Sequence, residues 1–355
     1  MNPSALVSAD SLRFFVNRCA TEVGLNPEDS DRFVYGVVEA DLRGIASHGV
    51  SRLPTYLRAL ATGVVNPAPD LHVVRSKGAI ELLDADNGLG VIVGQQAMEH
   101  AIRLAKTFGI GSVSVRNSNH SGMLAAHVLS GPPAGVISFF TSNGPAIMAP
   151  FGGREPRLGN GPVAYAIPRR GREPIVLDMA CSATNRGRIR LFAETGATLP
   201  PGWALDDNGQ PTQDASAALR GVVLPAGEHR GSGLAFVNEI LASVLAGASL
   251  AVDMPRAFLQ EGARVLDSWR CGHLAVAFDI EAFADMEAFL DEIEGLCTAV
   301  SSCPPVEGGT EVLLPGQVET RTRAGRLRDG IPLSRPTLAR LDEVADELRV
   351  DRLVR

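Results

Sequence analysis

Residues 79–115 decide the fold; they read AIELLDADNGLGVIVGQQAMEHAIRLAKTFGIGSVSV. Residues 79–84 and 111–115 have the short apolar character of buried strands, whereas residues 95–108 repeat apolar positions at helical spacing. The glycine-rich segment DNGLGVIVG, residues 86–94, lies between the first strand and the helix. The stretch therefore predicts a strand, a glycine-containing turn, a helix and a second strand.

The glycines of this turn, Gly88, Gly90 and Gly94, have the spacing GxGxxxG. Dinucleotide-binding βαβ units carry GxGxxG instead and end their second strand with an acidic residue that binds a ribose hydroxyl, which is absent here. We therefore favour a turn that needs the backbone freedom of glycine. A phosphate-binding loop is the less favoured alternative.

The regions on either side of this stretch differ in their residue patterns. The first seventy residues have helical periodicity, with Gly24 and Gly44 as predicted helix ends. Beyond residue 115 we expect strands at 135–140, 163–168, 174–179 and 275–280, and helices at 234–246, 281–296 and 334–348. The closely spaced strands predict a substantial sheet, and the apolar face of the last helix predicts packing on the N-terminal helices.

Composition excludes several classes of function. The 355 residues carry a formal net charge of −7 without a basic stripe, which argues against nucleic acid as the main partner. No apolar run is long enough for a membrane span, and the N-terminus lacks the features of a secretory signal, so we expect a cytoplasmic protein. The five cysteines are odd in number and widely spread, which indicates reduced thiols.

Two segments bear histidines among small polar residues and glycines: SHGVSR, residues 47–52, and NSNHSG, residues 117–122. His48 and His120 lie on predicted connections, where a ligand can approach, rather than inside apolar runs. Imidazole exchanges protons near neutral pH, and Arg52 is of the residue type that binds a carboxylate through two hydrogen bonds. We favour a chemical role for both histidines over a packing role.

Other candidate residues have two interpretations. Asp178 ends a predicted strand, where it either orients an imidazole or a cofactor hydroxyl, or caps the next helix. His229 and Arg230 precede an apolar helix, which suits an anion but also occurs without a ligand. His127 and His273 fit the core or surface better than a site. Neither HxH nor HExxH occurs, so we expect no metal site.

The motifs together resemble the type-2 malate/L-lactate dehydrogenase family over about residues 30–320. The matching segments are ADLRGIASHGVSRLPTYL (40–57), DNGLGVIVG (86–94), VRNSNHSG (115–122), MAPFGGREPRLGNGPVAYAIP (148–168), LDMACSATNRGRI (177–189), LPPGWALDDNGQPT (199–212) and GEHRGSGLAFVNEILASVLAGA (227–248). The family includes malate, lactate, sulfolactate and ureidoglycolate dehydrogenases, and diketogulonate and piperideine-2-carboxylate reductases.

The resemblance implies an α/β fold of α+β character that is not a Rossmann fold, with a large, mainly antiparallel NAD(P)-binding sheet, usually in a homodimer. It also implies a helical domain of residues 1–72 and 317–355 that contributes to the substrate site, beside a sheet domain of residues 73–316. Hydride would pass between NAD or NADP and a small 2-oxo or 2-hydroxy carboxylate.

The resemblance assigns roles residue by residue. His48 is similar to the proton donor and Ser47 to its relay partner; His120 competes for the same role, and Asp178 is a weaker relay candidate. The expected substrate contacts are Arg52, Thr141 and Asn143. The expected cofactor contacts are His120, Ser121, Gly122, Met123, Leu124, Ser142, Asp178, Met179, Ala180, His229 and Arg230.

Three departures from the family pattern bear on specificity. Ser121 replaces an aromatic residue, and HRGSG at residues 229–233 replaces HKGYG, which predicts a larger or more polar pocket. Arg188 stands where imine reductases carry Asp and hydroxy-acid enzymes Lys, which favours a 2-oxo acid. A cyclic imino carboxylate reductase is the alternative substrate class, and a cofactor-binding or non-redox biosynthetic protein is the alternative of another class.

Overall fold

The computed structural model describes residues 5–255 and 268–355. Its helices are α1 (Ala9–Glu22), α2 (Pro27–Leu42), α3 (Leu53–Ala61), α4 (Gly90–Phe108), α5 (Ala125–Val128), α6 (Arg186–Thr195), α7 (Ala215–Arg220), α8 (His229–Glu239), α9 (Met286–Ser301), α10 (Gln317–Asp329) and α11 (Arg335–Leu348). The strands are β1 (Ala5–Val7), β2 (His72–Lys77), β3 (Ile80–Asp84), β4 (Ile110–Ser118), β5 (Val136–Ser142), β6 (Val163–Ile167), β7 (Ile175–Met179), β8 (Ala204–Leu205), β9 (Pro211–Thr212), β10 (Val222–Val223), β11 (Cys271–Asp279) and β12 (Ile331–Leu333).

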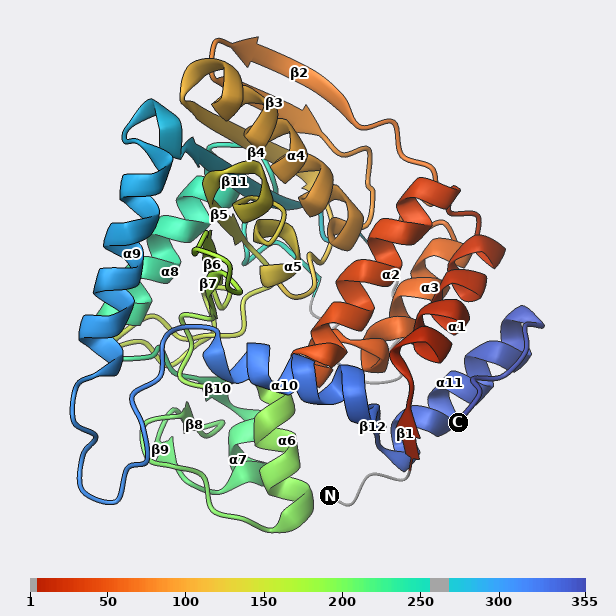
Figure 1. The fold of residues 1–355 in the computed structure, drawn as a ribbon. Helices are drawn as coiled ribbons and strands as arrows, with labels where there is room; N and C mark the ends of the chain where they lie inside the picture. Colours follow the sequence, from red (N-terminus) through yellow and green to blue (C-terminus); the bar gives the residue numbers. More distant parts are fainter. Residues whose placement is uncertain (1–4, 256–267) are drawn as a thin grey trace.

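A seven-stranded sheet in the order β2-β3-β4-β11-β5-β6-β7 forms the centre of the molecule (Figure 1). Only β3 and β4 pair in parallel; every other neighbouring pair in this sheet is antiparallel. A doubly wound Rossmann sheet is mostly parallel, so this topology differs from it. The predicted fold class, a large and mainly antiparallel sheet with helices, is confirmed.

The β3–α4–β4 unit was predicted correctly in kind, but α4 begins at Gly90, five residues before the predicted start. A Cβ atom on Gly90 would lie 2.1 Å from the carbonyl oxygen of Asn119, and one on Gly94 would lie 2.6 Å from the ring of His127. Gly90 therefore lets α4 pack closely against the loop after β4, and Gly94 lets it pack closely against α5. Neither glycine has a positive φ, so close packing accounts for them rather than the backbone freedom that was predicted.

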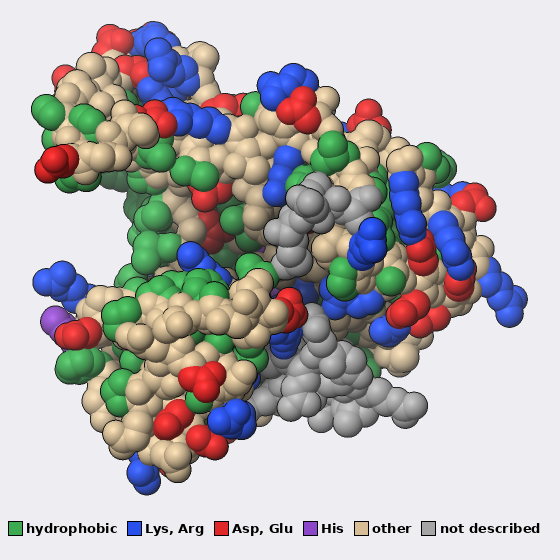
Figure 2. Space-filling view, turned by 90° about the horizontal axis from the view of Figure 1, so that it is seen from below, with side chains coloured by type: hydrophobic (Ala, Val, Ile, Leu, Met, Phe, Trp, Pro, Cys, Tyr) green, Lys and Arg blue, Asp and Glu red, His purple; other side chains and the backbone are tan. Residues whose placement is uncertain are grey.

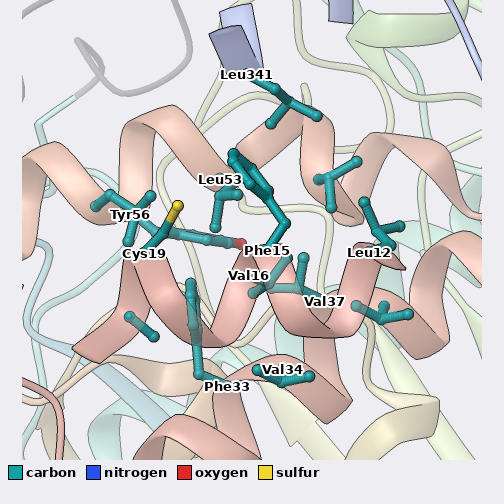
Figure 3. Close-up of a cluster of buried hydrophobic side chains, with 14 of the residues drawn as sticks. Leu12, Phe15, Val16, Cys19, Phe33, Val34, Val37, Leu53, Tyr56 and Leu341 are labelled. Carbon is teal, nitrogen blue, oxygen red and sulfur yellow. The ribbon is translucent and has the colours of Figure 1, made fainter. Parts of the chain in front are cut away.

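The N-terminal helices share one apolar core with the C-terminal segment. Residues of α1, α2 and α3 pack with Leu338, Leu341 and Val344 of α11, and the close-up in Figure 3 shows Leu341 above Phe15 and Leu53. β1 pairs with β12, with Ala5 opposite Leu333. Gly24 and Gly44 end their helices with positive φ, as predicted. The division into two domains stays a prediction.

A smaller lobe contains the three-stranded sheet β10-β8-β9 beside α6 and α7, with its own apolar core (Figure 1). α8 begins at His229, before the predicted start at residue 234, and continues into a π-helical turn, η4 (Ile240–Val244). None of the helices in the described part of the chain has the length and apolar character needed to cross a bilayer. All five cysteines are free thiols.

Candidate active site

A cleft of about 610 Å³ lies where segments distant in sequence meet. Its walls come from the connection between α2 and α3, the loop after β4, the ends of β5 and β7, the start of α6, and the start of α10. The cleft therefore brings together the two histidine segments singled out in the sequence. Its volume lies within the usual range of pockets for small molecules and cofactors.

His48 and His120 stack on each other in the cleft. Their ring centroids lie 5.6 Å apart, and the ring planes differ by 16°. The edge of Trp269 packs against His120 at 5.5 Å. His48 belongs to the short 3-10 turn η1 (Ala46–His48), whereas His120 belongs to the loop after β4. The fold thus places the two competing imidazoles within one site.

The partners of Nδ1 distinguish the two histidines. On His120, Nδ1 accepts hydrogen bonds from the Tyr56 hydroxyl at 2.6 Å and from the Gly122 amide at 3.3 Å. An amide N–H is only a donor, so Nδ1 of His120 carries no proton and Nε2 carries the proton of the neutral ring. On His48, Nδ1 lies 2.9 Å from the Ser47 hydroxyl, which both donates and accepts.

Burial lowers the pKa of both imidazoles. Desolvation, with a smaller contribution from the positive charge of Arg52, lowers the pKa of His48 to about 4. Desolvation, followed by the charges of His48 and Arg52, holds the pKa of His120 well below its usual value. Both rings are therefore neutral near pH 7 in the protein alone. An anion on Arg52 would cancel part of its field and raise the pKa of His48.

Arg52 has its guanidinium available for a ligand. Its Nε donates to the carbonyl oxygen of Ser47 at 3.0 Å, which fixes the side chain beside His48. It forms no ion pair with any residue in the described ranges, 5–255 and 268–355. The two terminal nitrogens can therefore make the forked contact that suits a carboxylate.

Asp41 holds the segment that bears these residues. Its Oδ2 accepts from the Val50 amide at 2.7 Å, and a Cβ on Gly49 would lie 2.3 Å from the carboxyl group. Burial raises the pKa of Asp41 to about 7, although the Val50 amide and Arg326 partly oppose this rise. The buried carboxyl thus anchors the turn between His48 and Arg52 to α2.

Two fully buried histidines support the walls of the cleft. His273 of β11 bridges the hydroxyls of Ser118 at 2.8 Å and Ser142 at 2.9 Å, which end the strands on either side of β11, β4 and β5. Nε2 of His127 lies 2.8 Å from the carbonyl oxygen of Ser121, an acceptor, so this nitrogen donates. Desolvation lowers the pKa of His273 to about 3 and that of His127 to about 4. Both are core histidines, as predicted.

Asp178 lines the cleft but bonds to backbone amides. Its Oδ2 accepts from the Ala125 amide at 2.7 Å, so the carboxylate caps the start of α5 rather than that of the next helix in sequence. Desolvation raises its pKa to about 6. Asp178 therefore ties β7 to the loop that contains His120, and no hydrogen bond joins it to either catalytic candidate within the described residues.

The remaining predicted contacts fall into two groups. Those that line the cleft are Ser47, Arg52, Ser121, Gly122, Met123, Leu124, Ser142, Asn143, Met179 and Ala180. Thr141 is fully buried, does not line the cleft, and donates to the carbonyl oxygen of Pro162. The Asn143 amide is bonded to Glu239, Ser249 and Gly272, so it shapes the wall and has little capacity left for a substrate.

Three basic or titratable side chains lie away from the cleft. His229 and Arg230 are exposed at the start of α8 and do not line the cleft. Arg188 stacks on the ring of Trp203 at 4.9 Å, outside the cleft as well. The cofactor role of His229 and Arg230 stays a prediction without support from their placement, and Arg188 gives no contact on which to choose between an oxo acid and an imine.

Several site residues carried no signal in sequence. Tyr56 lies in an apolar helix, where its ring packs against Phe33, and only the fold brings its hydroxyl to His120. Trp269 reaches His120 from the start of β11. Arg43 lines the cleft from the end of α2. Arg43 lies within the segment ADLRGIASHG, but no residue pattern there indicated a role for it.

The cleft suits a dinucleotide better than a metal ion. In the described part of the chain, no group of three or more His, Cys, Asp or Glu residues has metal-binding geometry. Asn185, Arg186 and Gly187 open the N-terminus of the ten-residue helix α6 onto the cleft, an arrangement that favours phosphate. The loop Ser121–Leu124 provides small and apolar surface beside His120 for a planar ring.

Comparisons with known proteins agree with this geometry. The family model described as malate/L-lactate dehydrogenase matches residues 7–342. L-sulfolactate dehydrogenase of Methanocaldococcus jannaschii is 36% identical and covers 91% of each chain. Malate dehydrogenase of Pyrococcus horikoshii is 33% identical over 98% of this chain and 96% of its own. (2R)-3-sulfolactate dehydrogenase (NADP(+)) of Chromohalobacter salexigens is 36% identical over 92% of each chain.

Solved structures give the same picture. The sulfolactate dehydrogenase from Methanocaldococcus jannaschii superposes with a TM-score of 0.91 at 32% identity, covering 98% of both chains. The Δ1-piperideine-2-carboxylate reductase from Pseudomonas syringae superposes with a TM-score of 0.83 at 29% identity, covering 96% of this chain and all of the other.

Proposed function

We propose that this protein transfers hydride between the nicotinamide and C2 of a 2-oxo or 2-hydroxy carboxylate. The proposal starts from its family, because the chain belongs to the malate/L-lactate dehydrogenase family and is an NAD(P)-dependent oxidoreductase. The observation that carries the substrate class is the pairing of a free guanidinium, Arg52, with a proton-exchanging imidazole, His48, in one cleft. The intact Ser47, His48 and Arg52 argue against a non-redox role.

His48 is the residue that moves the proton. Nε2 of His48 has no hydrogen-bond partner in the described structure, and the Ser47 hydroxyl at Nδ1 tolerates either protonation state. In the oxidation direction the neutral ring accepts the proton of the substrate hydroxyl at Nε2; in the reduction direction the imidazolium returns it. His120 keeps Nε2–H as a fixed hydrogen-bond donor, because its Nδ1 faces an amide N–H.

Arg52 orients the substrate. Its terminal nitrogens bind the C1 carboxylate, and its Nε contact with Ser47 keeps that carboxylate at a fixed position relative to His48. The bound carboxylate also offsets the charge that lowers the pKa of His48, so substrate binding brings the proton donor closer to physiological pH.

The assay follows absorbance of the reduced nicotinamide with NADH and NADPH against 2-oxo acids and cyclic imino carboxylates. We expect turnover with 2-oxo acids, and we expect His48→Gln to lower kcat by about 10²- to 10⁴-fold with cofactor binding unchanged. For oxidation, kcat/KM should be constant above about pH 5 and fall tenfold per pH unit below the free-protein pKa of about 4, because protonated His48 is no base.

The matched control is His72→Gln, which alters an exposed histidine on β2 and should leave turnover unchanged. Full turnover by a folded His48→Gln protein would contradict the assignment of His48. Turnover with imines alone would transfer the proposal to the cyclic imino carboxylate class.

We also propose that the protein is a homodimer. Phe236, Val237, Ile240, Val244 and Leu245 are each 40–61% exposed along α8 and η4, which is unusual for a continuous helical face in a monomer. Figure 2 shows hydrophobic side chains gathered in a hollow at the left of that view, on the side where Figure 1 places α8 and α9.

We further propose a cytoplasmic location, with which the five free thiols are consistent.

A further inference from the structure

Arg43 is a second arginine in the cleft with unused donors. Its Nε donates to Glu39 at 2.8 Å, and both side chains are only 4% exposed. Its terminal nitrogens make no hydrogen bond to any residue in the described ranges, and the side chain lines the cleft. Arg43 thus repeats the arrangement of Arg52: Nε is held by the protein and the forked end is left for a ligand.

The charges around Arg43 do not balance. One oxygen of Glu39 accepts from Arg43 and also from Nε of Arg323 at 2.7 Å. Arg326 adds a third guanidinium, which donates to the backbone oxygen of Asp41. Glu39 and Glu319, a second acid that α10 brings to the cleft, can neutralise two of these three cations, and the Asp41 carboxyl is largely protonated below its raised pKa of about 7. Buried charges normally find partners, so the excess positive charge favours an anion in the cleft.

Other arginines of the cleft wall are already satisfied. Arg58 forms a two-pronged ion pair with Glu347 at 2.6 and 3.0 Å. Arg186 donates to the carbonyl oxygens of Leu219 and Gly221. Arg43 differs from both because its only ion-pair partner among the described residues is Glu39, which it shares.

Arg43 lies on the same short segment as the proton-exchanging site. The hydrogen bond between Asp41 and Val50 closes this segment, and Arg43 and Arg52 each lie two residues from it. Gly44 packs against Thr322 of α10, which places the Arg43 end of the segment toward α10. The two free guanidinium groups therefore line one cleft on either side of Ser47 and His48.

We propose that Arg43 forms a second oxyanion subsite, separate from the C1-carboxylate site at Arg52. Its ligand is either the distal carboxylate or sulfonate of a dianionic substrate, or a phosphate of the cofactor. The proposal rests on the proposed function, and it assigns to Arg43 the discrimination between ligands that carry this second anionic group and ligands that lack it.

The test compares Arg43→Gln with the unaltered protein. Calorimetry measures the Kd of NADH and NADPH, and of malate and lactate in the presence of NAD or NADP; kcat/KM is measured with oxaloacetate and pyruvate. If the subsite holds the distal group, malate binding and oxaloacetate kcat/KM fall about 10- to 100-fold while lactate and pyruvate change less than twofold. If the subsite binds a phosphate of the cofactor, the Kd of NADPH alone, or the Kd of both NADH and NADPH, rises by the same factor.

Arg352→Gln is the matched control, because it removes an arginine that lies outside the cleft and has a two-pronged ion pair with Asp346; it should change each constant less than twofold. Arg43→Lys keeps the charge beside Glu39 and loses the fork, so it should show a smaller loss in the same direction and serves if Arg43→Gln fails to fold. Unchanged discrimination and cofactor binding in a folded Arg43 variant would overturn the subsite. Absence of turnover in the unaltered protein would instead overturn the proposed function, while the calorimetry still tests the subsite.

Discussion

The chemistry of the two stacked imidazoles is set by what each Nδ1 contacts. His120 faces an amide N–H and the Tyr56 hydroxyl, so its tautomer is fixed. His48 faces the Ser47 hydroxyl, so its proton can come and go. Both histidines were candidates from the sequence, which could not choose between them, because the choice depends on the contact that each Nδ1 makes in the folded protein.

Tyr56→Phe tests this division of roles. The substitution keeps the ring that packs against Phe33 and removes only the hydroxyl donor to His120. Losing one such hydrogen bond costs about 1–2 kcal/mol, which should lower kcat about 5- to 30-fold. Nitrogen NMR of the ring-labelled protein should show the proton on Nε2 of His120 before and after the substitution, because the Gly122 amide still faces Nδ1, and the Nδ1 resonance should shift when the hydroxyl donor is lost.

Tyr35→Phe is the control, since Tyr35 is 40% exposed on α2 and should change neither kcat nor the His120 spectrum. A His120 ring that carries its proton on Nδ1 in the unaltered protein would contradict the assignment of roles. Arg52 lines the cleft, and its predicted role as the carboxylate contact stays a prediction; the buried neighbour Asp41 that holds its turn was found only in the structure.

At the scale of elements, the close contact between α4 and the loop after β4 positions His120. Gly90 and Gly94 lie where any side chain would meet backbone or an imidazole ring. The sequence rules treat such glycines as turn residues, so they placed the helix start too late. Close packing, rather than conformational freedom, explains glycine at these positions, because neither residue has a positive φ.

Gly90→Ala should therefore lower both the stability and the activity of the protein. Its Cβ would lie 2.1 Å from the Asn119 oxygen, so the loop that bears His120 must shift. We expect a loss of about 1–3 kcal/mol in the free energy of unfolding, measured by urea denaturation, together with reduced kcat. Gly295→Ala, in an exposed part of α9 with no atom within 4 Å of the new Cβ, should instead stabilise by up to about 1 kcal/mol. Equal effects of the two substitutions would contradict the packing argument.

Elements with a clear apolar stripe were predicted well and charged elements were not. α11 starts after Ser334, whose hydroxyl accepts from the Thr337 amide, within the predicted range 334–348, and it buries Leu338, Leu341 and Val344. α10 has no buried residue and carries four arginines and two acids, so periodicity gave no signal for it. This same helix contributes Glu319 to the cleft and Arg323 to the cluster around Glu39, which is why that part of the site escaped prediction.

For the whole molecule, the exposed face of α8 and η4 predicts association. Sedimentation equilibrium should give twice the 37.4 kDa mass of one chain. The double variant Phe236→Asp, Leu245→Asp should sediment as a monomer, because it places charges on a surface that pairing would desolvate. Phe14→Asp, which alters a 65% exposed residue of α1, should remain a dimer. A monomeric unaltered protein would contradict the proposal.

A substantial sheet and the helices beside it were predictable in kind, because apolar periodicity reports local structure, whereas the mainly antiparallel pairing was implied by the family resemblance. The order of strands was not, since β11 inserts between β4 and β5 from more than a hundred residues later in the chain. Such a pairing depends on long-range packing that no local pattern encodes. The strands on either side of β11 carry Ser118 and Ser142, so the His273 bridge that joins them could not be foreseen either.

The shared core of the two chain ends has a consequence for synthesis. About 270 residues separate α3 from β12, and a ribosome adds roughly 5–20 residues per second, so α1, α2 and α3 wait roughly 15–50 s for the strand and helix that complete their core. During that interval the nascent chain exposes the apolar faces later covered by α11, and the turn that bears His48 and Arg52 lacks its support. A chaperone that shields these faces would act on this protein while it is being translated, and the cleft forms only when the last elements emerge.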